Sequence, residues 1–163
     1  VAANYLKPKE SPDAWVVEVV NTMKMGDCDK LEKLLTSFFA SIPYSQRRKG
    51  DEREKERYFQ YTFYLVIRMI SSFTVLIEKE QSEGRVDCII ETPMFVYIFE
   101  FKRDGSATEA LKQIEEKGYA REYATDNRTI YLIGCNFSSK TGTIDDWKSK
   151  GENLRKLSDF SDK

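Results

Sequence analysis

The sequence of 163 residues contains no histidine. This absence excludes catalysis by Ser-His-Asp or Cys-His groups, and it excludes zinc and haem sites that depend on imidazole ligands. Cysteine is also scarce: only Cys28, Cys88 and Cys135 are present, and no Cys-x-x-Cys pair occurs. Such usage is typical of a reducing compartment, so we expect a reduced, cytoplasmic protein.

Long apolar segments are missing as well. No run approaches the roughly 20 residues of a membrane-spanning helix, and the charged residues around Pro8 do not resemble a signal peptide, so we expect no membrane partner. Positive and negative charges are nearly balanced, since the sequence has 26 Lys and Arg and 27 Asp and Glu. This balance argues against a uniformly basic nucleic-acid binder but leaves a local basic patch open. The chain begins with Val1, and we expect it to be part of a longer protein.

The residues that are present are typical of a globular domain, with 33% charged and 13% aromatic side chains. Apolar periodicity and turn residues predict the secondary structure. The predicted elements, in chain order, are helices at about 12–25, 28–40 and 51–71, strands at about 73–80, 85–92 and 95–102, a helix at about 106–124 and a strand at 128–136. Beyond Phe137 the sequence is polar and supports no assignment.

This order of elements predicts an α/β (α+β) fold. Three strands that follow one another as a meander, then a crossover helix and a fourth strand, form a mixed sheet. We therefore expect a central sheet of about four strands flanked by helices, with an N-terminal helical extension.

The segments around Asp87 and Glu100 carry the most information about function. If Pro93 and Met94 form the turn of a hairpin, paired residues sum to 187, and Asp87 lies directly across from Glu100. Like charges placed opposite one another on apolar strands are destabilising. A divalent cation between the two carboxylates would remove this repulsion, and Mg²⁺ favours such oxygen ligands. Lys102 lies two residues beyond Glu100 on the same face and could stabilise negative charge on a phosphate.

A structural explanation of the same residues remains open. A Glu-x-Lys pair on a strand is most often an exposed ion pair that contributes well under ~1 kcal/mol. The matching position of Asp87, and the apolar neighbours of both carboxylates, favour a metal site over this explanation.

Five motifs together resemble one family. They are, in chain order, Glu56-x-Tyr58-Phe59-Gln60-Tyr61-Thr62-Phe63-Tyr64, Gly84-Arg85-Val86-Asp87, Tyr97-Ile98-Phe99-Glu100-Phe101-Lys102, Ala110-Leu111-Lys112-Gln113-Ile114-x-x-Lys117-Gly118-Tyr119 and Ile133-Gly134-x-Asn136-Phe137. The sequence is similar to the PD-(D/E)XK nuclease superfamily over roughly residues 50–148. More narrowly, it resembles a branch that forms the C-terminal domain of bacterial proteins with an AAA-ATPase-like N-terminal region. Val86 stands where the family name has Pro.

The resemblance implies a restriction-endonuclease-like core and a metal-dependent phosphodiesterase. It implies that Asp87 and Glu100 bind Mg²⁺ or Mn²⁺, and that Lys102 orients the attacking water or stabilises charge. Glu56 corresponds to a further metal ligand on the helix before the sheet, although it lies in a run of mixed charge. Gln113 corresponds to a glutamine that assists the site in related nucleases, and its alternative is an ordinary surface amide.

The resemblance also divides the chain. It implies an N-terminal helical segment at 1–49 that leads from an upstream ATPase-like region, a nuclease-like domain at 50–148 and a polar tail at 149–163. We expect nucleic acid as the partner, DNA in preference to RNA, and a homo-oligomer is possible. The alternative function is a catalytically weak nuclease-like module that binds nucleic acid or drives oligomerisation of an AAA-ATPase-like protein.

Overall fold

The computed structural model of the chain describes residues 12–41, 74–81 and 84–152. Its elements are α1 (Pro12–Met25), α2 (Cys28–Ser41), β1 (Thr74–Gln81), β2 (Gly84–Glu91), β3 (Phe95–Arg103), α5 (Ala107–Lys117), the 3₁₀ helix η2 (Tyr119–Tyr123), β4 (Thr129–Ser138) and β5 (Thr143–Glu152). The helix predicted at 51–71 lies outside the described residues.

The first two helices begin and end where the sequence predicts. Gly26 adopts a left-handed φ of 72° and ends α1, and the next residue caps α2, because the Asp27 Oδ1 atom accepts a hydrogen bond from the Lys30 amide at 3.0 Å. Apolar residues of α2 recur at helical spacing and are buried, among them Leu31 and Leu35. Each helix therefore presents one apolar side to the rest of the chain.

The crossover helix begins as predicted but ends earlier. The Ser106 hydroxyl caps α5 by accepting a hydrogen bond from the Glu109 amide at 3.0 Å. The prediction that this helix continues to Ala124 is wrong, because Gly118 adopts a left-handed φ of 63° and its amide bonds back to the carbonyls of Glu115 and Ile114. The chain then continues as the separate 3₁₀ helix η2.

The five strands form one sheet in the order β1-β2-β3-β4-β5. The β3–β4 pair is parallel and the other pairs are antiparallel, which confirms the predicted mixed sheet flanked by helices. The sheet gains a strand, β5, from the polar segment that the sequence analysis left unassigned. This strand runs through Glu152 and so includes the beginning of the predicted tail at 149–163.

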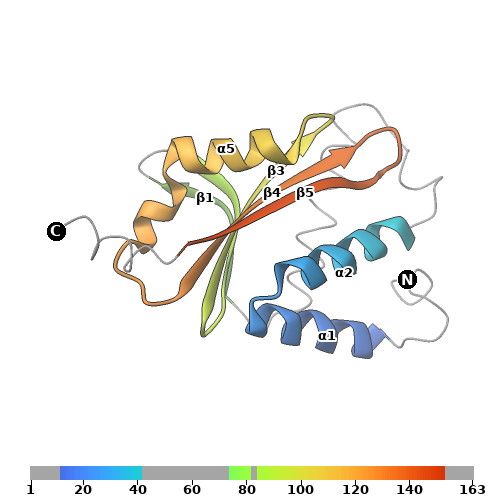
Figure 1. Cartoon of the computed structure of the whole chain (residues 1–163), viewed down its shortest axis with the longest axis horizontal. Helices are drawn as coiled ribbons and strands as arrows, with labels where there is room; N and C mark the ends of the chain where they lie inside the picture. Colours follow the sequence, from blue (N-terminus) through green and yellow to red (C-terminus); the bar gives the residue numbers. More distant parts are fainter. Residues whose placement is uncertain (1–11, 42–73, 82–83, 153–163) are drawn as a thin grey trace.

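Helices cover both faces of the sheet, so the fold has three layers (Figure 1). One face packs on α1 and α2, and the hydroxyl of Tyr97 on β3 donates to the Met23 carbonyl of α1 at 2.6 Å. The other face packs on α5 and η2 through a second core that includes Ile98, Ile114 and Leu132. The predicted N-terminal helical segment therefore shares a core with the sheet.

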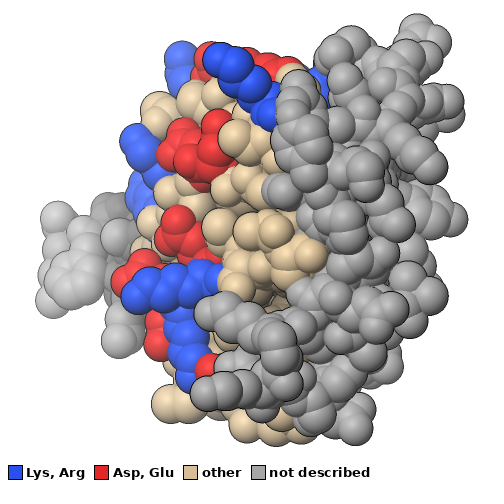
Figure 2. Space-filling model, turned by 90° about the vertical axis from the view of Figure 1, so that its right-hand side faces the viewer, with Lys and Arg blue, Asp and Glu red and all other residues tan. Residues whose placement is uncertain are grey.

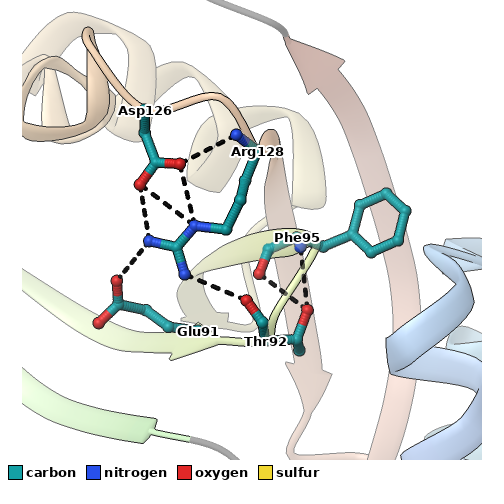
Figure 3. A network of polar contacts seen from close by, with 5 residues as sticks. All are labelled: Glu91, Thr92, Phe95, Asp126 and Arg128. Atoms are coloured by element: carbon teal, nitrogen blue, oxygen red, sulfur yellow. Dashed lines mark hydrogen bonds and ion pairs between the residues drawn. The ribbon is translucent and has the colours of Figure 1, made fainter.

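At one end of the sheet, Arg128 connects the β2–β3 turn with the loop before β4 (Figure 3). The Arg128 guanidinium forms ion pairs with Asp126 at 2.6 Å and with Glu91 at 2.9 Å, and it donates to the Thr92 carbonyl at 3.1 Å. Thr92 in turn closes the β2–β3 turn, because its side chain accepts from the Phe95 amide at 3.0 Å. This cluster joins the β2–β3 turn to the start of β4.

Within the described parts of the chain, no helix is long and apolar enough to cross a membrane.

Candidate active site

The β2–β3 hairpin has the predicted register. Its pairs run from Glu91 opposite Val96 to Cys88 opposite Phe99, and each pair sums to 187. One further step in this register places Asp87 across from Glu100. At this step the Asp87 carboxylate accepts a hydrogen bond from the backbone amide of Phe101 at 2.9 Å. The hairpin therefore brings both predicted carboxylates side by side, several residues away from the turn that Arg128 contacts.

Glu100 lies in an unusual environment for a carboxylate. It is only 4% exposed, on the face of β3 that α5 covers. Its Oε1 atom accepts a hydrogen bond from Gln113 Nε2 at 2.5 Å, whereas Oε2 is buried and has no hydrogen-bond partner in the described structure. Burial, together with the negative charge of Asp87, raises the pKa of Glu100 to about 8, and the Lys102 charge opposes this shift.

Gln113 links the glutamate to the lysine of the site. The Lys102 Nζ atom donates to Gln113 Oε1 at 2.5 Å, so the amide of Gln113 bridges the two side chains. The buried Tyr119 side chain is a further hydrogen-bond partner of Gln113. Three residues predicted from the sequence, Glu100, Lys102 and Gln113, thus form one hydrogen-bonded group, with Asp87 beside it.

Gln113 can reach β3 because α5 packs closely on β4. Gly134 is the position on β4 that lies in register with Glu100. A Cβ atom at Gly134 would lie 2.2 Å from the carbonyl oxygen of Ala107 and 2.8 Å from the amide nitrogen of Leu111. The missing side chain therefore lets the backbone of α5 approach the sheet beside the carboxylates.

The donor set fits a divalent cation that binds oxygen. Asp87 and Glu100 provide carboxylates in neighbouring positions, and Glu100 Oε2 is a buried acceptor without a partner in the described structure. The described residues contain no cluster of three or more Asp, Glu, Cys or His side chains that could hold a metal. The third predicted ligand, Glu56, lies outside the described residues. A cation with few protein ligands and several waters, such as Mg²⁺, suits this arrangement.

Two polar residues beside the site were not predicted as site residues, although one of them, Asn136, belongs to a motif of the family resemblance. Asn136 lies in register with Lys102 on β4 and is only 2% exposed, and Asp146 pairs with Asn136 from β5. A buried Asn at the end of an otherwise apolar strand was the available signal, since such a group needs hydrogen-bond partners. Asp146 lies in a strand that the polar sequence did not reveal.

Comparison with known proteins identifies the family. Residues 54–147 match the family model described as the PD-(D/E)XK nuclease superfamily. The chain is also 32% identical over 129 residues to a protein of Azotobacter chroococcum mcd 1, described as an uncharacterized protein in the vnfD 5′ region. That match covers 78% of this chain but only 25% of the relative, so the chain spans about a quarter of the relative's length. No solved structure matches the chain.

The mixed sheet and the paired carboxylates followed by a lysine agree with this match. The chain belongs to the PD-(D/E)XK nuclease superfamily.

Proposed function

We propose that this domain is a Mg²⁺- or Mn²⁺-dependent nuclease that hydrolyses phosphodiester bonds of DNA. The observation that supports the proposal most strongly is the hydrogen-bonded group of Glu100, Gln113 and Lys102 next to Asp87. Family membership supports a nucleic-acid substrate. Asp87 and Glu100 are the proposed metal ligands, with Glu56 as a third, and the bound cation would supply the Lewis-acid chemistry of phosphodiester hydrolysis.

The side chains of this chain have separate tasks in the proposal. The Lys102 ammonium has three N–H donors and uses one on Gln113, so the others can hold a water molecule or stabilise charge on a phosphoryl oxygen. Gln113 orients both Lys102 and Glu100 through its two amide atoms. The apolar residues around Glu100 restrict water, which strengthens the electrostatic interactions of the site.

We also propose that the domain acts as part of a longer polypeptide with an AAA-ATPase-like region upstream. The resemblance of the motifs supports this arrangement, and so does the greater length of the Azotobacter relative. Acidic and basic side chains are interspersed over the described part of the face in Figure 2. Part of the affinity for nucleic acid would therefore come from the rest of the longer protein. The free, buried cysteines agree with a cytoplasmic location.

The direct test compares the wild-type chain with Lys102→Ala on supercoiled plasmid, single-stranded DNA and RNA, with Mg²⁺, with Mn²⁺ and with EDTA. We expect metal-dependent cleavage of DNA that falls by roughly 10²- to 10³-fold in Lys102→Ala, because a donor to developing charge is lost. Circular dichroism and thermal melting confirm that the variant folds. Equal trace activity in both proteins would overturn the proposal. The alternative, a binding module without catalysis, predicts that the wild-type chain and Lys102→Ala bind DNA equally well and that neither cleaves it.

A further inference from the structure

A β-bulge near the start of β5, opposite the end of β4, lets two neighbouring carboxylates form contacts on the same side of the sheet. The register between β4 and β5 shifts after Asn136, which leaves Asp145 as the extra residue. In a regular strand Asp145 and Asp146 would point to opposite faces of the sheet. Here Asp145 Oδ1 accepts from the Asn136 amide group at 2.8 Å, and Asp146 Oδ2 accepts from the Ala107 backbone amide at 2.8 Å.

These contacts hold the segment that joins Lys102 to α5. Lys102, Asn136 and Asp146 lie in one row across β3, β4 and β5. Asn136 Oδ1 accepts from the Gly105 amide in the connecting loop at 2.9 Å, and Asp146 binds the first residue of the helix. Figure 1 shows that the end of β4, the start of β5 and the start of α5 lie at the same end of the sheet.

The position of α5 decides where Gln113 lies. The two hydrogen bonds of Gln113 to Lys102 and Glu100 are 2.5 Å long, and hydrogen bonds weaken steeply when their geometry is lost. Asp146 binds α5 at its N-terminus, where an amide has no partner within the helix and where a carboxylate is favoured by the helix dipole. Loss of this contact would let the start of the helix move away from β5.

We propose that Asp146 is a positioning residue for the active site: by binding the Ala107 amide it holds α5 so that Gln113 bridges Lys102 and Glu100. This inference rests on the proposed nuclease function for its kinetic consequence, but its structural part does not depend on activity. Asn136 supports the same segment through Gly105, and Asp145 orients Asn136.

The test uses Asp146→Ala, the conservative Asp146→Asn and a matched control, Lys150→Ala. Lys150 also joins β5 to α5, through an exposed ion pair with Glu115 near the end of the helix at 2.7 Å. We expect Asp146→Ala to lower kcat for DNA cleavage by roughly 10- to 100-fold with KM unchanged, since displacements of about 1 Å have effects of this size. Asp146→Asn retains an oxygen acceptor for Ala107 and should recover most of the rate. Lys150→Ala should leave kcat unchanged.

A second measurement does not require cleavage. The side-chain NH₂ resonances of Gln113, assigned by comparison with Gln113→Ala, should shift in Asp146→Ala and stay in place in Lys150→Ala. If the wild type cleaves no nucleic acid while these resonances shift, the nuclease proposal fails and the positioning role stands. If the wild type is active and Asp146→Ala changes neither kcat nor the resonances, the positioning role is overturned. An Asp146→Asn variant as impaired as Asp146→Ala also contradicts it.

Discussion

Glu100 lies directly beside Gly134 in the parallel register of β3 and β4. A buried carboxylate and a glycine are thus neighbours across two strands, and the backbone of α5 packs over the space that the glycine leaves. The backbone of α5 can pack close to Glu100 because Gly134 has no side chain.

Gly134→Ala is therefore expected to destabilise the domain and to disturb the site. The added Cβ would lie 2.2 Å from the Ala107 carbonyl oxygen, so α5 must move outward, at a cost of about 1–3 kcal/mol. Urea denaturation measures the loss. Gly151→Ala is the control, because its Cβ would meet the Tyr131 ring at 2.9 Å, and a side chain yields more easily than a helix backbone. Equal losses in the two variants would contradict the close packing of α5.

Metal binding should depend on both carboxylates of the hairpin. We expect Mn²⁺ to raise the melting temperature of the wild-type chain and to have no such effect on the double variant Asp87→Asn/Glu100→Gln, which lacks the charged oxygen ligands. Glu91→Gln serves as the control, because Glu91 pairs with Arg128 and should leave the Mn²⁺ effect intact. A melting shift that persists in the double variant would place the metal elsewhere.

The stability of the metal-free protein should fall as pH rises toward 8. Burial raises the pKa of Glu100 from its ordinary value of 4.5 to about 8, so between these values the unfolded chain has lost a proton that the folded chain keeps. The contribution of protonated Glu100 to the free energy of unfolding is therefore complete below about pH 4.5. It is lost as pH rises through 8, by at most about 1.4 kcal/mol per pH unit.

Glu100→Gln removes this titration. Urea denaturation in EDTA at several pH values should show a flatter profile for the variant and a higher stability than wild type near pH 8. Glu116→Gln changes an exposed glutamate paired with Lys112 and should keep the wild-type slope. Parallel profiles for wild type and Glu100→Gln would show that Glu100 is ionised throughout this range.

The arginine cluster at the other end of the sheet should matter for stability but not for metal binding. Arg128 is about a quarter exposed and bonds to Asp126, Glu91 and the Thr92 carbonyl. Removal of its guanidinium leaves two partly buried carboxylates without their ion-pair partner, so Arg128→Ala should lose about 1–3 kcal/mol of unfolding free energy. The control Lys112→Ala breaks an exposed helix pair and should lose less than about 0.5 kcal/mol. If Arg128→Ala is as stable as Lys112→Ala, the stabilising role of Arg128 is refuted. If Arg128→Ala changes the melting shift caused by Mn²⁺, the cluster is not independent of the metal site.

The sequence predicted the hairpin register because its signals are local. A turn centred on Pro93 and Met94 fixes which residues pair, and the pairing of Asp87 with Glu100 follows by counting. The early end of α5 was also visible in principle, since Gly118 is a residue that commonly ends a helix. The apolar residues beyond Gly118 instead suggested a longer helix, although they belong to η2.

The fifth strand could not be recognised for a physical reason. Ile144 and Trp147 both face the α1–α2 core, but the extra residue Asp145 separates them by three positions instead of an even number. The bulge therefore breaks the alternation that identifies a strand. The same irregularity hides Asp146, because its contact with Ala107 depends on distant parts of the chain.

The chain order of the sheet has a consequence for assembly. Strands β1 to β5 are neighbours in the order in which they occur, and Asp87, Glu100, Lys102 and Gln113 lie within a single continuous stretch of sequence. Closing short loops has a low entropic cost, so a hairpin and the helix that follows it can gather these groups with few long-range contacts. The strands β4 and β5 orient these groups from beside β3, whereas the two N-terminal helices pack on the other face of the sheet.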